Sequence, residues 1–185
     1  MAKKKAKKKS MLGWAMLAVV VIGAALMVTG IFLDWTQVNV ESVIGNSEGA
    51  KLTLQDYTEM IQKQQEVDDA IGSVVEADSV VDGKMASMVA FAYIAVIAMA
   101  ATAVLYLLKS FLNIGLLRLL TLIGALATIV CTVIMAICTF VFASDYQGGL
   151  GELVKGAMVP AVGAWLAMVG GVVGGVGGLI GARSK

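Results

Sequence analysis

Residues 2–34 read AKKKAKKKSMLGWAMLAVVVIGAALMVTGIFLD, a lysine-rich leader followed by a long apolar run. A helix needs about 20 apolar residues to cross the hydrocarbon core of a bilayer, and residues 11–33 supply this length without a charge. Lipid offers no hydrogen-bond partners, so the backbone of such a run must satisfy itself as an α-helix. The stretch therefore predicts a membrane span, preceded by a disordered polybasic leader at residues 1–10.

Three further apolar runs repeat this pattern, and the composition of the whole chain agrees with them. The chain is 59% hydrophobic and 15% charged, whereas soluble domains are about half apolar and about a quarter charged. We expect an all-α membrane protein built as a four-transmembrane-helix bundle. The spans are predicted at residues 11–33, 85–108, 119–143 and 158–181. Aromatic residues with a polar edge favour the membrane interface, and four fall near predicted span ends: Trp14, Trp35, Tyr146 and Trp165.

Charged residues are divided between the two sides of the predicted bundle. Ten of the 14 basic residues lie in the leader, in the link at residues 109–118 and in the tail at residues 182–185, with no acidic residue among them. All 13 acidic residues lie in the loops at residues 34–84 and 144–157. Because short basic segments stay in the cytoplasm, we expect a multi-pass protein of the cell membrane (plasma or inner) with both termini cytoplasmic. The first run is longer than a signal core and lacks an A-x-A-like site, so an anchor is favoured over a cleaved signal peptide.

The loop at residues 34–84 is the largest piece predicted outside the membrane. Residues 36–43 alternate polar and apolar side chains, and residues 45–49 carry turn residues. Residues 51–54 can then return as a second short strand, which predicts an extracytoplasmic β-hairpin. Further along the loop the apolar period changes to three and four residues, so an amphipathic helix is predicted over residues 54–75.

The apolar stripe of this predicted helix needs a cover. Thr53 is expected to cap its first turn. Either the hairpin and the outer ends of the spans cover the stripe, or a partner protein does. Five residues of the stripe are therefore candidates for partner contact: Tyr57, Met60, Ile61, Val67 and Ile71.

The fourth predicted span carries a face of small residues at three- and four-residue spacing. Small residues let helices approach closely in lipid, where hydrophobic burial does little to drive association. Each glycine costs a helix about 1 kcal/mol relative to alanine, so the face is expected to make a compensating contact. That contact is either with Gly23, Gly30 and Gly124 of the other spans or with a second copy in a homo-oligomer. The face consists of Gly163, Ala167, Gly170, Gly171, Gly174, Gly175, Gly178 and Gly181.

The lysines of the leader are sufficient to set the orientation of the first span. They are also candidates for binding anionic lipid head groups on the cytoplasmic face, because each lysine near such a surface contributes about 1 kcal/mol. No aromatic residue or folded module accompanies them, so nucleic-acid binding is not expected. The residues concerned are Lys3, Lys4, Lys5, Lys7, Lys8 and Lys9.

Residue types that carry chemistry are missing from the predicted spans. No Asp, Glu, Lys, Arg or His lies within them, although ion and proton pathways usually place such groups at membrane depth. The chain has no histidine at all, and nothing in it meets the requirements of a catalytic, metal or cofactor site. The threonines of the spans can bond their own helix backbone and need no pore: Thr102, Thr121, Thr128, Thr132 and Thr139.

These observations favour a non-enzymatic protein that acts as an assembly, scaffold or accessory subunit. It would act through lateral packing of its helices and through its external loop. The expected partners are membrane lipids and either another membrane protein or a second copy of the chain, with no cofactor and no small-molecule substrate. The alternative is a homo-oligomeric channel or pore-forming subunit, lined by the last span and its threonine-bearing neighbours.

The arrangement resembles that of claudin-type tetraspan proteins. The likeness consists of four spans with internal ends, a large first external loop that starts with a hairpin, a short second loop, and Trp35 just after the first span. In that family the first loop carries a paired-cysteine motif with a second tryptophan, whereas residues 34–84 contain no cysteine. The tail also lacks a scaffold-binding motif. The layout is similar as well to small bacterial tetraspan membrane proteins with a glycine-rich last span.

Overall fold

The computed structural model describes residues 2–42, 45–71, 83–112, 114–145 and 154–183. These residues form five helices and three strands. In chain order the elements are α1 (Ala2–Phe32), β1 (Asp34–Ser42), β2 (Gly45–Thr53), α2 (Leu54–Ile71), α3 (Gly83–Leu112), α4 (Gly115–Asp145), β3 (Val154–Pro160) and α5 (Val162–Arg183).

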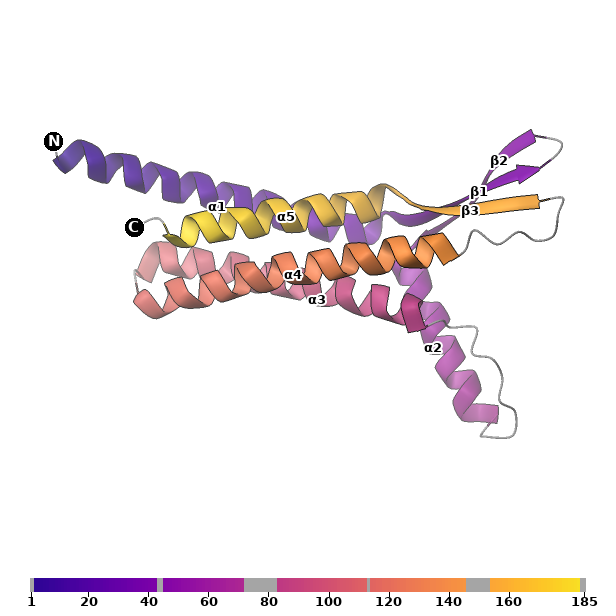
Figure 1. The fold of residues 1–185 in the computed structure, drawn as a ribbon. Coiled ribbons are helices and arrows are strands. Elements are labelled where there is room, and N and C mark those ends of the chain that lie inside the picture. The colour runs from indigo at the N-terminus through magenta and orange to yellow at the C-terminus, as the bar shows by residue number, and fades with distance from the viewer. Residues whose placement is uncertain (1, 43–44, 72–82, 113, 146–153, 184–185) are drawn as a thin grey trace.

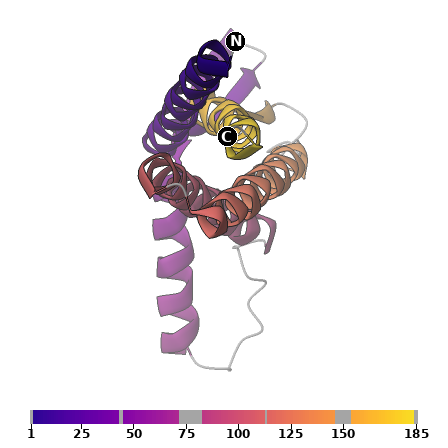
Figure 2. The ribbon, with the colours of Figure 1, turned by 90° about the vertical axis from the view of Figure 1, so that its left-hand side faces the viewer.

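Four of the helices are long and apolar enough to cross a membrane. They contain the segments Met11–Phe32, Gly83–Leu112, Gly115–Ser144 and Val162–Arg183. The helices lie side by side as a bundle (Figure 1), which the end-on view in Figure 2 also shows. Large apolar side chains such as Ile97 and Phe111 are exposed on its outside, as suits a surface that meets lipid. The predictions of a mostly helical fold and of a multi-pass membrane protein are confirmed.

Both ends of the described chain lie at the same end of the bundle. Ala2 begins α1 and Arg183 ends α5 there, while the strands and α2 lie at the opposite end (Figure 1). Helix α1 includes residues 2–10, for which the sequence predicts disorder. Alanine and lysine are good helix formers, so the leader continues the helix that the apolar run begins.

The three strands form one antiparallel sheet in the order β2-β1-β3. Strand β1 pairs with β2 from Asp34 opposite Thr53 to Ser42 opposite Gly45. On its other side β1 pairs with β3, where Thr36 lies opposite Pro160. The sheet therefore joins the two loops that the sequence treats as separate.

Strand β3 also changes the start of the last helix. The sequence predicts a loop at residues 144–157 and a span from residue 158, but residues 154–160 are a strand and α5 begins at Val162. Strand β1 offers an open edge beside them, whose backbone groups pair with those of β3. A backbone bond from Ala161 N–H to the carbonyl of Trp35 (2.9 Å) then closes the sheet where α5 starts.

Helix α2 begins at a reciprocal capping arrangement. The backbone N–H of Asp56 donates to Thr53 Oγ1 (3.2 Å), and both the N–H and the hydroxyl of Thr53 donate to Asp56 Oδ2 (2.7 Å each). This satisfies two orphan groups of the first turn, and the bonds from Thr53 lower the pKa of the Asp56 carboxyl below its usual value. The prediction of Thr53 as the cap is confirmed. The helix is described to Ile71; the rest of its predicted range, residues 72–75, lies outside the described residues.

Candidate functional site

The small-residue face of α5 meets α1 backbone to backbone. A Cβ added to Gly23 would lie 2.5 Å from the Cα of Gly174, and one added to Gly170 would lie 2.6 Å from the carbonyl oxygen of Gly23. The next contact along the pair is similar, since a Cβ at Gly30 would lie 2.5 Å from the carbonyl oxygen of Gly163. No side chain fits at these distances, so α1 and α5 approach this closely only because both carry glycine there.

The other side of the same face meets α3 and α4. A Cβ at Gly175 would lie 2.5 Å from Ile129 Cγ1, and one at Gly178 would lie 2.9 Å from the Cβ of Ala125. Gly171 faces Thr132, and Gly181 faces the ring of Tyr106. All eight residues of the predicted packing or oligomer face are buried within the chain: Gly163, Ala167, Gly170, Gly171, Gly174, Gly175, Gly178 and Gly181.

The surface of α5 that remains open is made of larger residues. Its exposed apolar side chains are Val162, Trp165, Val169, Val172, Val173, Val176 and Ile180. Of the small residues in the other spans, Gly23 and Gly30 lie against α5, whereas a Cβ at Gly124 would lie 2.7 Å from Thr102 Oγ1 of α3. Gly124 thus serves the contact between α3 and α4.

The threonines of the spans are buried and use their hydroxyls within their own helices. Thr102 donates to the carbonyl of Ala98 (2.8 Å), and Thr132 donates to that of Thr128 (2.7 Å). Thr121, Thr128 and Thr139 make the same four-residue bond. The prediction that these hydroxyls bond their own backbone is confirmed.

At the end of the bundle where the chain starts and stops, α3 is tied to α1 and α5. Lys109 Nζ donates to the carbonyls of Gly181 (2.6 Å) and Ala182 (3.1 Å), which are among the last carbonyls of α5. The hydroxyl of Tyr106 donates to the carbonyl of Gly13 in α1 (2.9 Å). A cation at a helix C-terminus is favourable because the last carbonyls lack helical partners.

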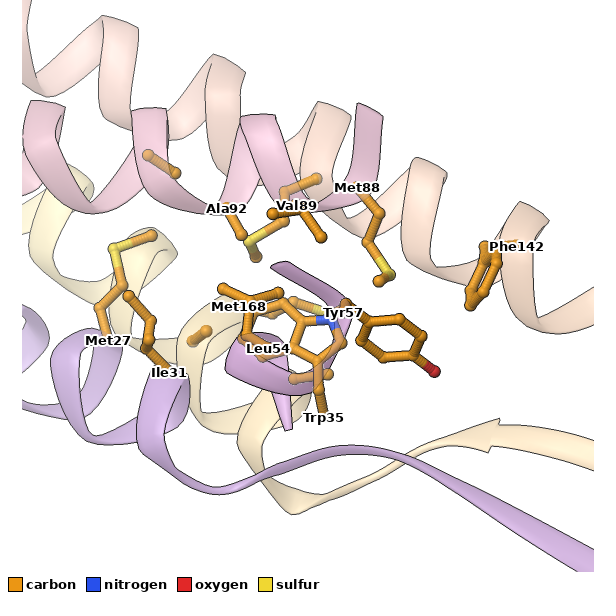
Figure 3. Packing of buried hydrophobic residues seen from close by; sticks show 14 of the residues in the cluster. Met27, Ile31, Trp35, Leu54, Tyr57, Met88, Val89, Ala92, Phe142 and Met168 are labelled. Atoms are coloured by element: carbon orange, nitrogen blue, oxygen red, sulfur yellow. The ribbon is translucent and has the colours of Figure 1, made fainter. Parts of the chain in front are cut away.

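At the other end, the sheet and α2 are anchored on the bundle by a junction that consists of Trp35, Thr36, Leu54, Tyr57, Phe142 and Met158. Trp35 and Leu54 are fully buried, and Tyr57 is 2% exposed. Figure 3 shows the rings of Trp35 and Tyr57 close together, below Met88 and Val89 of α3. The junction thus joins residues of β1, α2, α4 and β3, and it packs against α3.

Polar and aromatic contacts fix Tyr57 within this junction. Its hydroxyl lies 2.5 Å from Thr36 Oγ1 and donates to the sulfur of Met158 at 3.7 Å. Its ring meets that of Phe142 edge to face, with centroids 5.6 Å apart. The indole N–H of Trp35 is buried without a hydrogen-bond partner among the described residues. One tyrosine thereby links α2 to the sheet and to α4.

The five residues predicted for partner contact do not share one environment in the structure. Tyr57 lies inside the junction, and Ile61 is half-buried against the same core. Met60 lies beyond it and is 44% exposed. The side chains of Val67 and Ile71 lie outside the part of the chain whose side chains are described. Beyond the junction, α2 leaves the bundle and points away from it, as both Figure 1 and Figure 2 show.

Trp35 and Phe142 take part in the junction although the sequence does not single them out for it. The position of Trp35 after the first span suggests a place among lipid head groups, but the side chain is fully buried. Phe142 looks like any other apolar residue of its span. Only the alternation of polar and apolar residues that starts at Thr36 indicates that the chain forms a strand here. That strand covers the adjacent end of the helix bundle.

No cluster of three or more His, Cys, Asp or Glu side chains occurs in the described part of the chain. No known protein family matches this sequence, and no curated protein matches it.

Proposed function

We propose that this protein is a non-enzymatic membrane assembly or accessory protein. The four-helix bundle acts as a rigid base, and the module formed by the sheet and α2 is the part that a partner binds outside the membrane. The observation that carries this proposal is the junction, because it fixes the first turn of α2 through Tyr57 while leaving Met60 exposed on the turn that follows. A helix that is held at its first turn and exposes an apolar side chain on the next turn is suited to presenting that side chain to another protein.

The packing of the bundle gives less support to a channel lined by α5. The glycine face that would line a pore or join copies is in contact with α1, α3 and α4. The buried hydroxyls that could line a polar path bond to backbone carbonyls. A close-packed bundle of this kind supports a structural role for the spans.

We also propose that the junction and the module lie outside the cytoplasm. The support is the charge pattern. Lys109 is in the last turn of α3, Arg118 in the first turn of α4 and Arg183 in the last turn of α5, and these helix ends lie opposite to the module, in segments without acidic residues (Figure 1). The lysines at residues 3–9, whose side chains lie outside the described part of the chain, would then be on the side of the cytoplasmic leaflet, where anionic head groups attract basic segments.

The orientation is tested by labelling single introduced cysteines in intact cells. Lys63→Cys, on the exposed surface of α2, is expected to react with a membrane-impermeant maleimide before permeabilisation. Gly115→Cys, where α4 begins, is expected to react only afterwards. The unsubstituted chain, whose two cysteines lie in α4, sets the background. The reverse pattern of labelling would place the module in the cytoplasm and reject the orientation.

Partner binding is tested by a photoreactive amino acid at Met60. Irradiation of cells is expected to give a cross-linked adduct larger than the 19.2 kDa chain, because Met60 is the exposed apolar residue of the described stripe. The matched control is the same group at Gln62, which is exposed and two residues further along the helix. A tagged second copy separates self-association from binding of another membrane protein. Equal yields at both positions, or none at Met60, would contradict the proposal.

A further inference from the structure

Two pairs of aromatic rings lie on the outside of the bundle, one toward each end. Trp14 of α1 meets Phe111 of α3 edge to face, with ring centroids 6.5 Å apart. Nearer the module, Phe140 of α4 meets Trp165 of α5 in the same way, with centroids 5.8 Å apart. All four side chains are at least 45% exposed. They differ in this from Trp35, which is buried in the junction, and each pair bridges two helices on the surface that faces lipid.

The contact between Gly23 and Gly174 gives the height of the two exposed tryptophans along the bundle. A Cβ at Gly23 would lie 2.5 Å from the Cα of Gly174, so the two glycines are at one level. Helices α1 and α5 run in opposite directions (Figure 1). Trp14 precedes Gly23 by nine residues, and Trp165 precedes Gly174 by nine residues. Each tryptophan therefore lies about 13.5 Å from the glycine contact, on opposite sides of it.

The resulting separation of the two tryptophans, about 27 Å along the bundle, is close to the hydrocarbon thickness of a bilayer, which is about 30 Å. Charged residues begin at the same two levels. Arg183 is exposed and follows Gly174 by nine residues, and Asp34 lies beyond the end of α1, eleven residues after Gly23. In the described helices no charged residue lies between the two levels. Two independent features, exposed tryptophan and the first charges, thus mark the same boundaries.

We propose that the two aromatic pairs bind the head-group regions of the two leaflets and thereby fix the depth of the bundle in the membrane. An indole ring suits this boundary because its apolar body lies in hydrocarbon while its N–H reaches polar lipid groups. A protein partner would not require the pairs to be one hydrocarbon thickness apart. The contact between Gly23 and Gly174 then lies at the middle of the bilayer.

This assignment makes the hydrocarbon-embedded part of the bundle shorter than its longest helices. Helices α3 and α4 have 30 and 31 residues, which corresponds to about 45 Å. Their ends therefore project into the head groups and beyond. Because the two boundaries are equally far from the glycine contact, the inference is independent of the proposed orientation. It is also independent of the proposed partner of α2.

The depth is tested by fluorescence quenching in vesicles of phosphatidylcholine that carries bromine either near the head group or near the end of the acyl chain. The chain has three tryptophans. Trp35→Phe combined with Trp165→Phe leaves Trp14 as the reporter, and Trp35→Phe combined with Trp14→Phe leaves Trp165. Each reporter is expected to be quenched more strongly by bromine near the head group, because both lie at the edge of the hydrocarbon.

The matched control is Ile97→Trp in a chain whose own tryptophans are all replaced by phenylalanine. Ile97 is 68% exposed, and it is two residues from Met99, whose side chain faces Gly174. This tryptophan should be quenched more strongly by bromine near the chain end. The same depth profile for all three reporters would overturn the proposal. Absence of quenching of Trp14 or Trp165 by either lipid would overturn it as well, because a second copy would then cover that pair.

A second measurement uses the unaltered protein, so it does not depend on how a variant folds. The chain is reconstituted in phosphatidylcholine bilayers with short, intermediate and long acyl chains, and thermal unfolding is followed by circular dichroism. Hydrophobic mismatch lowers stability, so Tm should be highest where the hydrocarbon core is about 27–30 Å thick. A Tm that continues to rise in the thickest bilayers would show that the ends of α3 and α4 set the depth, and the proposal would fail.

Discussion

Gly23→Ala is expected to lower the stability of the bundle by about 2 kcal/mol or more. The added methyl group would lie 2.5 Å from the Cα of Gly174 and 2.7 Å from the carbonyl oxygen of Gly170. Overpacking against side chains costs about 1–3 kcal/mol, and a clash with backbone is at the upper end because backbone cannot rotate away. The alanine itself favours the helix by at most about 1 kcal/mol. Thermal unfolding in detergent, followed by circular dichroism, should show Tm lower by about 5 °C or more.

The matched control for this substitution is Gly115→Ala. There the methyl group meets no atom of the described residues within 4 Å, so the stability should stay the same or rise slightly through helix propensity. Equal unfolding temperatures for the two variants would show that α1 and α5 do not approach as closely as described. If Gly23→Ala instead reduced the size of an oligomer and left the unfolding of the monomer unchanged, the glycine face would join copies of the chain.

The four spans are predictable from the sequence because their cause is local. Each is an uncharged run long enough to cross lipid, and lipid allows such a run only one regular structure. Strand β3 is not predictable in this way. Residues 154–160 show neither a clear alternation nor a turn signal, and they become a strand because β1 lies beside them. That neighbourhood is created by the close approach of Gly30 and Gly163, which are far apart in the sequence.

At the candidate site too, the features with a local cause are predictable from the sequence, and those that depend on long-range contacts are not. The three- and four-residue spacing of apolar residues predicts that α2 has an apolar face, and Thr53 before it is a residue type that caps helices. The period does not tell which residues of the face are covered by the chain itself. Tyr57 is covered because Phe142 of α4 and Met158 of β3 pack against it, while Met60, three residues further along α2, remains exposed. Trp35 is buried for the same reason, although its place after a span favours the interface.

Trp35→Ala is expected to loosen the junction by about 3–5 kcal/mol, the range for truncating a large buried aromatic residue. Trp35 is fully buried, and it packs between the end of α1 and the start of α2. Hydrogen exchange should rise in β1, β3 and α2, while the protected centres of α3, α4 and α5 should change little. Tyr57→Phe removes only the hydroxyl that meets Thr36, so about 1 kcal/mol is expected for it.

The control for Trp35→Ala is Trp14→Ala, because Trp14 is 58% exposed on α1 and its loss should leave exchange in the module unchanged. The two variants also separate the roles of base and module. If the junction serves to hold α2 in place for a partner, Trp35→Ala should abolish cross-linking from Met60 while the protein still inserts in the membrane. Cross-linking that survives the loosened junction would mean that the partner recognises α2 without the sheet, and similar exchange in both variants would mean that Trp35 does not anchor the module.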